Sequence, residues 1–207
     1  DPVVVTGETR FDQPVPPALV AAGRAAREAL AGGRMVVTLA STVEGEDDIY
    51  LRAIRILRRD LQARGQGLLA VWVPRRPERF AEVGGRIAAA GLRLARRSQL
   101  LAPDFGIAAQ APETDVLLGD SLGEMYAYLA MADRVVVGGG FTRGGAHNII
   151  APRVLGRAVV TGPVTWPIEY PFAEAAAAGR AQTVPDAEAL AAALAAPPLA
   201  GEAAAAA

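Results

Sequence analysis

The chain alternates short runs of apolar, often β-branched residues with longer segments in which apolar residues recur at helical spacing. Short runs bounded by Gly or Pro predict strands, whereas the helical period predicts helices with one apolar face. Strands are expected at residues 3–6, 35–40, 68–73, 115–118, 134–137 and 158–161. Helices are expected at residues 17–31, 46–63, 78–90, 123–130, 148–155 and 187–195. Strand and helix therefore alternate along nearly the whole chain.

This alternation predicts an α/β fold, a Rossmann-like parallel sheet of about six strands with helices on both faces. Parallel strands need a crossover connection long enough to hold a helix, which the longer segments supply. A chain of 207 residues suits one domain, expected at 1–195, followed by a low-complexity tail rich in Ala and Pro at 196–207. In such sheets ligands bind at the carboxyl ends of the strands, so the loops there are the first place to look for function.

The composition supports this fold and indicates neither nucleic acid nor a membrane surface as a partner. Hydrophobic residues make up 52% of the chain but aromatic residues only 5%, as expected of buried parallel strands covered by Ala-rich helices. A net charge of -1 offers no overall field for nucleic acid or an anionic membrane surface. The sequence has no membrane-length apolar run and no signal-peptide pattern, so we expect the fragment to be soluble. No cysteine is present and no cluster has metal-ligand spacing, so no metal and no cofactor is expected.

The basic residues are all arginine, because the chain contains no lysine. A lysine Schiff base and a P-loop lysine are therefore excluded. The chain also has a single histidine, His147, directly followed by its single asparagine, Asn148. This pair is either functional or a plain helix cap, and the sequence leaves both readings open.

The strongest local signal is a glycine-rich segment after the strand at 134–137, with five glycines in the eight positions 138–145. Glycine lets the backbone turn sharply and approach a ligand closely, and the N–H groups of a following helix start favour an anion. The sequence therefore predicts a phosphate site here, with His147 and Asn148 as further donors. The alternative is a tight turn with glycine for conformational reasons only.

Three further strand ends carry polar clusters. Residues 41–46 follow one strand and resemble a capped helix start, with Ser41 or Thr42 as the cap and acidic residues in the first turn. For residues 46–48 a role at the helix start alone is favoured, while Ser41, Thr42 and Glu44 stay candidates for binding. Two guanidiniums, Arg75 and Arg76, follow another strand, where their forked geometry suits a phosphate or carboxylate. The loop 119–125 could read a base edge with its backbone.

These loops converge on one rim of the sheet and predict a nucleotide or phosphosugar site. No nucleophile elbow and no acid/base pair of carboxylates is present, so no catalytic residue is assigned. The candidate binding residues are Ser41, Thr42, Glu44, Pro74, Arg75, Gly123, Glu124, Met125, Gly139, Gly144, Gly145, His147 and Asn148.

The motifs on this rim resemble, in order, those of the 3-deoxy-D-manno-octulosonic acid (Kdo) transferases of lipid A assembly in Gram-negative bacteria. The similarity spans about residues 3–178. Its motifs are residues 6–12, 40–46, 73–80, 119–124, the glycine pairs 138–139 and 144–145, the pair 147–148, and 162–163.

The resemblance implies the C-terminal half of a GT-B glycosyltransferase, with two facing Rossmann-like domains. Such an enzyme moves Kdo from CMP-Kdo to lipid A precursor in lipopolysaccharide biosynthesis, without a metal at the reacting centre. This chain would bind the nucleotide sugar. The catalytic carboxylate and the acceptor groove would belong to an N-terminal domain absent here, so this fragment alone is expected to be inactive. The full-length protein would work at the cytoplasmic face of the inner membrane.

The sequence departs from the family pattern at three positions. The family usually has His where this chain has Val43 and Arg76, and Glu where it has Ala151. These departures suggest an alternative, a divergent non-catalytic paralogue that binds a sugar nucleotide. A further alternative is a GT-B enzyme that uses a UDP-sugar. The donor, the acceptor and the number of sugars added stay open at this point.

Overall fold

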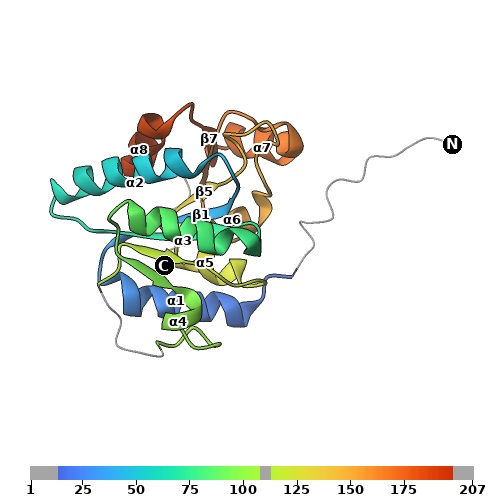
Figure 1. Ribbon diagram of the computed structural model, residues 1–207. Helices are drawn as coiled ribbons and strands as arrows, with labels where there is room; N and C mark the ends of the chain where they lie inside the picture. Colours follow the sequence, from blue (N-terminus) through green and yellow to red (C-terminus); the bar gives the residue numbers. More distant parts are fainter. Residues whose placement is uncertain (1–13, 108–112, 198–207) are drawn as a thin grey trace.

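The computed structural model describes residues 14–107 and 113–197 and shows a seven-stranded sheet flanked by helices (Figure 1). The strands are β1 (Met35–Thr42), β2 (Leu68–Pro74), β3 (Leu94–Arg96), β4 (Val116–Leu118), β5 (Arg134–Val137), β6 (Val159–Thr161) and β7 (Ala181–Thr183). Every pairing between these strands is parallel. The expected α/β class with a parallel sheet is confirmed. The strand expected at 3–6 lies outside the described residues.

Helices cover both faces of the sheet. They are α1 (Pro17–Ala31), α2 (Asp47–Gln62), α3 (Phe80–Ala89), α4 (Arg97–Leu100), α5 (Met125–Met131), α6 (Ile150–Val154), α7 (Glu169–Ala177) and α8 (Ala187–Ala195), with 3-10 turns η2 (Pro77–Arg79) and η3 (Trp166–Ile168). Alternate residues of a strand point to opposite faces. Val37 and Leu39 of β1 accordingly pack in the core under α2 and α8, whereas Val36 packs in the core under α1 and α5. Figure 1 shows α2 and α8 on one side of the sheet and α1 on the other.

The strand order is β3-β4-β2-β1-β5-β6-β7. The chain first builds the half-sheet containing β2, β3 and β4 on one side of β1, and then returns to add β5, β6 and β7 on the other side. The order therefore reverses between β1 and β5. In open α/β sheets this switch point opens a crevice at the carboxyl ends of the strands.

The short elements are where sequence and structure differ. β3, β7 and α4 were not expected, because three or four residues of mixed polarity carry no clear period. The nine-residue helix α7 was not expected either, and its sequence contains Pro171. The helix expected at 78–90 is divided into η2 and α3, and the helix expected at 148–155 is shortened to α6. Boundaries elsewhere agree within two residues.

The capped helix start expected at Ser41 or Thr42 is wrong. Both residues belong to β1, and α2 begins only at Asp47, with Glu46 at its N-cap and no side-chain cap bond. The Thr42 hydroxyl instead accepts a hydrogen bond from Trp72 Nε1 at 2.9 Å between β1 and β2. A buried indole N–H needs such a partner, which explains why a polar residue stands at this strand end.

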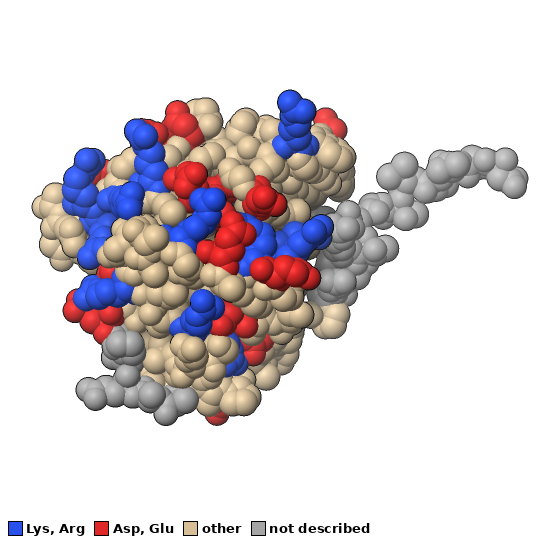
Figure 2. Space-filling model, in the orientation of Figure 1, with Lys and Arg blue, Asp and Glu red and all other residues tan. Residues whose placement is uncertain are grey.

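The surface is of mixed charge, and none of the described helices is both long and apolar enough to cross a membrane. Figure 2 shows arginine and acidic side chains interspersed over one face of the molecule.

A prediction concerns Gly138, which follows β5 and lies against the end of β1. A Cβ atom there would be 2.5 Å from the Ser41 carbonyl oxygen and 2.6 Å from Thr42 Cα. Backbone cannot move aside cheaply, so Gly138→Ala should lower the free energy of unfolding by about 2 kcal/mol or more in urea titrations. The control is Gly85→Ala in α3, where a Cβ meets open space and should raise stability by about 0.5 kcal/mol. Equal stability of the two variants would contradict this packing.

Candidate functional site

The end of β1 is bent at Ser41, next to the switch point. Ser41 has a φ of 57°, in the left-handed region, and the register with β2 shifts between Ala40 and Thr42. Left-handed backbone is uncommon for residues other than glycine and is often found at binding sites. Gly138 packs directly on this bend, so the loops after β1 and β5 are in backbone contact.

The carboxylate of Glu46 lies inside the glycine loop after β5. Glu46 is fully buried, and its two oxygens accept hydrogen bonds from Gly139 N at 2.8 and 2.9 Å and from Phe141 N at 3.1 Å. The Val43 N–H also donates to it, at 3.2 Å. Sequence alone predicts a phosphate at these N–H groups, but the structure fills the position with the protein's own carboxylate. Interpreting Glu46 as only a cap residue is thus incomplete.

The helix start near His147 also differs from the expectation. α6 begins at Ile150 and spans only five residues. The His147 N–H donates to the Gly138 carbonyl at 3.0 Å, and the Ile150 N–H donates to Asn148 Oδ1 at 2.8 Å. Asn148 therefore forms a local Asx turn, as polar residues often do before a helix. The N–H groups of His147 and Ile150, two of those expected to face a phosphate, are therefore engaged within the protein.

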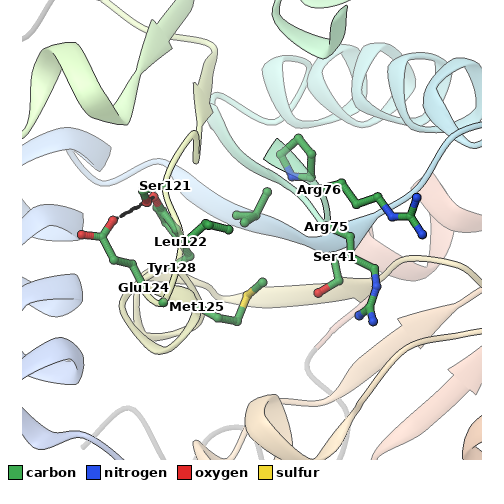
Figure 3. Close-up of a pocket in the computed structure, with 11 residues that line it drawn as sticks. Ser41, Arg75, Arg76, Ser121, Leu122, Glu124, Met125 and Tyr128 are labelled. Carbon is green, nitrogen blue, oxygen red and sulfur yellow. Dashed lines mark hydrogen bonds between the residues drawn. The ribbon is translucent and has the colours of Figure 1, made fainter. Parts of the chain in front are cut away.

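A first cavity of about 490 Å³ opens between the ends of β1 and β2 and the loop after β4. It is lined by Ser41, Val73, Pro74, Arg75, Arg76, Ser121, Leu122, Gly123, Glu124, Met125 and Tyr128. Figure 3 shows the serine and arginines of the strand ends on one side and the 121–128 segment on the other. Six of the candidate residues meet here, namely Ser41, Pro74, Arg75, Gly123, Glu124 and Met125.

A second cavity of about 400 Å³ adjoins the first, because Arg75 and Arg76 line both. Its remaining lining residues are Thr42, Val43, Glu44, Glu78, Arg79 and His147. The candidates Thr42, Glu44 and His147 thus join Arg75 here. The candidates Gly139, Gly144, Gly145 and Asn148 line neither cavity and form the loop beside them.

Arg79 is a buried cation that sequence reasoning missed. Its side chain is 10% exposed and its Nη2 donates to Asp47 Oδ2 at 2.5 Å. Among the described residues its buried Nε and Nη1 have no hydrogen-bond partner, although Nε lies 3.6 Å from Glu82 Oε2 in an ion pair. Burial alone would lower the pKa of Arg79, but the hydrogen bond and charge of Asp47 hold the pKa above its ordinary value. The available signal was its place in the motif at residues 73–80 that the chain shares with the Kdo transferases.

His147 is half-buried, and its Nε2 has no hydrogen-bond partner in the part of the chain that the structure describes. Burial and then the positive charge of Arg75 lower the pKa of His147 from 6.5 to about 4. The imidazole is therefore neutral at pH 7, so it can donate or accept a hydrogen bond in the second cavity. Within residues 14–107 and 113–197, no cluster of acidic, Cys or His side chains could hold a metal ion.

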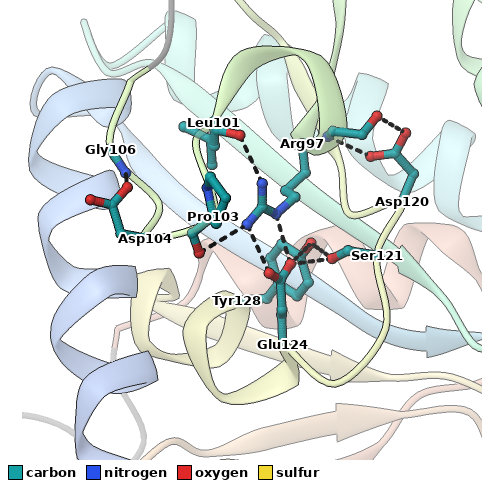
Figure 4. Close-up of polar contacts among 10 residues, drawn as sticks. Arg97, Leu101, Pro103, Asp104, Gly106, Asp120, Ser121, Glu124 and Tyr128 are labelled. Carbon is teal, nitrogen blue, oxygen red and sulfur yellow. Dashed lines mark hydrogen bonds and ion pairs between the residues drawn. The ribbon is translucent and has the colours of Figure 1, made fainter.

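Glu124 is already paired within the protein. Its oxygens accept two hydrogen bonds from Arg97, from Nε and Nη2, each at 2.7 Å (Figure 4). Burial would raise the pKa of Glu124, but the hydrogen bonds from Arg97 and Ser121 outweigh burial and lower it. The carboxylate is thus ionised at neutral pH, and its charge is matched by a guanidinium rather than by a ligand.

Fold and rim together define a Rossmann-like domain with a polar, arginine-rich site at its switch point. No protein-family model matches the chain. The chain is 43% identical over 183 residues to the 3-deoxy-D-manno-octulosonic acid transferase of Bordetella pertussis, covering 88% of the chain and 41% of that protein. It is 32% identical to the transferase of the same name from Haemophilus influenzae, covering 78% of the chain and 35% of that protein.

Among solved structures, the C-terminal CMP-Kdo binding domain of WaaA from Acinetobacter baumannii superimposes with a TM-score of 0.72 and 28% identity. The similarity covers 86% of this chain and 87% of that one. The resemblance to the C-terminal domain of Kdo transferases, suggested by the motifs, is therefore confirmed. The chain spans less than half the length of the curated transferases that it matches.

Removing the Glu46 carboxylate tests its role in the glycine loop. Glu46→Ala leaves the Gly139 and Phe141 N–H groups buried without a partner, so the free energy of unfolding should fall by about 3 kcal/mol. Glu44→Ala is the matched control, since Glu44 is exposed and should change stability by less than about 0.5 kcal/mol. Urea unfolding of both variants measures the difference. A loss below 1 kcal/mol for Glu46→Ala would contradict the assignment.

The low pKa of His147 predicts a pH-dependent loss of stability. Below its ordinary pKa of 6.5 the unfolded chain binds a proton, while the folded chain does not until about pH 4. The free energy of unfolding should therefore fall as the pH drops from 6.5 towards 4, by about 1 kcal/mol at pH 5 once solvent screening is allowed for. The His147→Gln variant should lose less stability over the same pH range. Because the chain has one histidine, its NMR titration measures the pKa directly. A measured value near 6.5 would show that the ring is solvated.

Proposed function

We propose that this domain binds CMP-Kdo as the donor half of a Kdo transferase. The observation that carries the proposal is the pair of adjoining cavities that share Arg75 and Arg76 at the carboxyl ends of β1 and β2. CMP-Kdo combines a nucleoside with two anionic groups, the phosphate and the carboxylate of the sugar acid. Arg75 and Arg76 line both cavities and could reach both anionic groups, while the loop after β4 adds apolar side chains to the first cavity.

The first cavity suits the nucleoside. Leu122, Met125 and Tyr128 supply apolar surface, and the hydroxyls of Ser41 and Ser121 lie on its walls. Pockets of this kind bind flat rings through apolar contact and a few placed polar groups. The backbone of the loop after β4 provides the remaining groups with which a base edge could be read.

The second cavity suits the phosphate and the sugar carboxylate. Arg75 and Arg76 are exposed at its mouth, and Arg79 has two buried nitrogens without a hydrogen-bond partner among the described residues. Asp47 and Glu82 already balance the charge of Arg79, which leaves the two exposed guanidiniums as the main cations beside the lining carboxylates of Glu44 and Glu78. Forked guanidinium donors match the geometry of both anionic groups. Neutral His147 adds a donor without adding a further desolvated charge.

Sugar transfer itself needs groups that this domain does not supply. We infer that the catalytic carboxylate and the site for lipid A precursor belong to an N-terminal domain of the whole protein, consistent with the 41% of a homologous transferase that this chain spans. The isolated domain, assigned to residues 1–195, would bind the donor without transferring Kdo. The whole protein would act in lipopolysaccharide biosynthesis at the cytoplasmic face of the inner membrane.

One observation favours a second candidate, a non-catalytic paralogue. Val43 and Arg76, two of the departures from the family pattern, line the second cavity, and Ala151, the third, packs partly buried in a core cluster. Val43 lines the second cavity alone, whereas Arg76 lines both, so the departures alter the second cavity most and also reach the first. Such a domain, or one built for a UDP-sugar, would show a different nucleotide preference. Calorimetric titration with CMP, UDP and ADP separates these cases.

Arg75→Ala tests the proposed function. Loss of a charge-assisted hydrogen bond to the phosphate should weaken CMP affinity roughly tenfold or more. The control is Arg52→Ala on α2, whose guanidinium is 68% exposed and pairs with Glu188 away from both cavities. Calorimetry measures both variants against the unaltered chain. Unchanged CMP affinity in Arg75→Ala, or a stronger preference for UDP or ADP, would contradict the proposal.

A further inference from the structure

The short helix α4 lies against the loop that follows β4, outside both cavities (Figure 4). Arg97, its first residue, is 6% exposed and makes a forked pair with Glu124 through Nε and Nη2. Two parallel hydrogen bonds fix the orientation of a carboxylate as well as its distance. Glu124 in turn lines the first cavity. Arg97 thus contacts a residue of the cavity wall, Glu124, although it does not line the cavity itself.

The guanidinium of Arg97 is oriented by its own segment. Its Nη1 donates to the Leu101 carbonyl at 2.8 Å, and its Cζ lies 4.5 Å from the centroid of the Phe105 ring. A cation over an aromatic face is stabilised electrostatically, more so when both are buried. The guanidinium is therefore fixed by contacts within its own segment as well as by Glu124, so it can act as an anchor for the loop.

The adjacent residue attaches the other end of the loop. Ser98 N donates to Asp120 Oδ1 at 2.9 Å, and the Ser98 hydroxyl donates to Asp120 Oδ2 at 2.7 Å. Asp120 and Glu124 mark the two ends of a five-residue segment. Arg97 and Ser98 therefore hold this segment, residues 120–124, at both ends.

Between these two attachments the segment forms the wall of the first cavity. The Ser121 hydroxyl donates to Glu124, and the Tyr128 hydroxyl donates to Glu124 Oε2 at 3.3 Å. Leu122 at the tip is 68% exposed, and Gly123 has a φ of 77°. A tip with so little of its own packing keeps its position only if its ends are held.

We propose that Arg97 is a positioning residue for nucleotide binding, which sets the loop wall of the first cavity through Glu124. This inference rests on the proposed function, because it assigns the nucleoside to that cavity. It implies that Arg97 affects the nucleoside end of a ligand, while anion binding in the second cavity does not depend on it.

The chain contains a matched control for this pair. Arg93 makes the same forked contact with Asp115, from Nε to Oδ2 at 3.0 Å and from Nη2 to Oδ1 at 2.7 Å. That pair joins the same two strands, β3 and β4, at their amino ends, whereas the cavities open at the carboxyl ends. The Arg93 side chain is 44% exposed and that of Arg97 only 7%, so the comparison rests on loop exchange and on CMP affinity relative to phosphate affinity, and not on total stability.

The experiment compares Arg97→Lys with Arg93→Lys in the same chain. Lysine keeps the positive charge but cannot make the two parallel hydrogen bonds to Glu124. Arg97→Lys should therefore weaken CMP affinity roughly five- to tenfold. The affinity for inorganic phosphate should change less than about twofold. Arg93→Lys should leave CMP affinity unchanged. Hydrogen exchange of residues 119–125, measured without ligand, should become faster in Arg97→Lys and not in Arg93→Lys.

Equal effects of the two substitutions on CMP binding, or unchanged exchange of the loop in Arg97→Lys, would overturn the inference. If the unaltered chain does not bind CMP, the proposed function fails, and the loop exchange still decides whether Arg97 holds the loop. Should Arg97→Lys not fold, Ser98→Ala removes the hydroxyl contact with Asp120 while keeping the backbone one. It should speed exchange of the same loop, and no change there would also overturn the inference.

Discussion

The carboxylate of Glu46 joins the two loops at the switch point of the sheet, and the shape of the rim depends on this contact. Glu46 belongs to the connection from β1 to α2, while its donors Gly139 and Phe141 belong to the loop after β5. A buried carboxylate is tolerable only when several donors surround it, and here backbone N–H groups supply them. Because these donors are engaged, a ligand anion is directed to the neighbouring arginines.

The charge on the rim accordingly comes from arginines rather than from a glycine-loop phosphate cradle. Arg75 and Arg76 follow β2 and face both cavities, and Arg79 is held beneath them by Asp47. Arg75 also helps keep His147 neutral, because two cations close together cost free energy. A bound anion would relieve this repulsion, so its arrival should raise the pKa of His147. An anion bound beside Arg75 would thereby be coupled to the protonation of the His147 ring.

Many of the residues at the carboxyl edge of the sheet could be predicted, because the sequence shows where each apolar strand ends. Ser41 and Arg75 follow apolar runs, and in a parallel sheet the residues that follow such runs share one edge, where the structure places both in one cavity. The roles of Glu46 and Glu124 could not be predicted in the same way. In the sequence Glu46 resembles an ordinary residue at a helix start, and Glu124 resembles a residue that contacts a ligand. In the structure each carboxylate accepts hydrogen bonds from within the protein, Glu46 from Gly139 and Glu124 from Arg97.

The sequence by itself determined the alternation of strands and helices, the parallel sheet and the family resemblance, because hydrophobic period and turn residues act locally. The tertiary structure alone decided which polar groups meet. Glu46 reaches a glycine 93 residues later, and Arg97 reaches Glu124 because β4 inserts between β2 and β3. Such pairings depend on strand order, which local patterns do not encode. A buried charge must find its partner in space rather than along the chain.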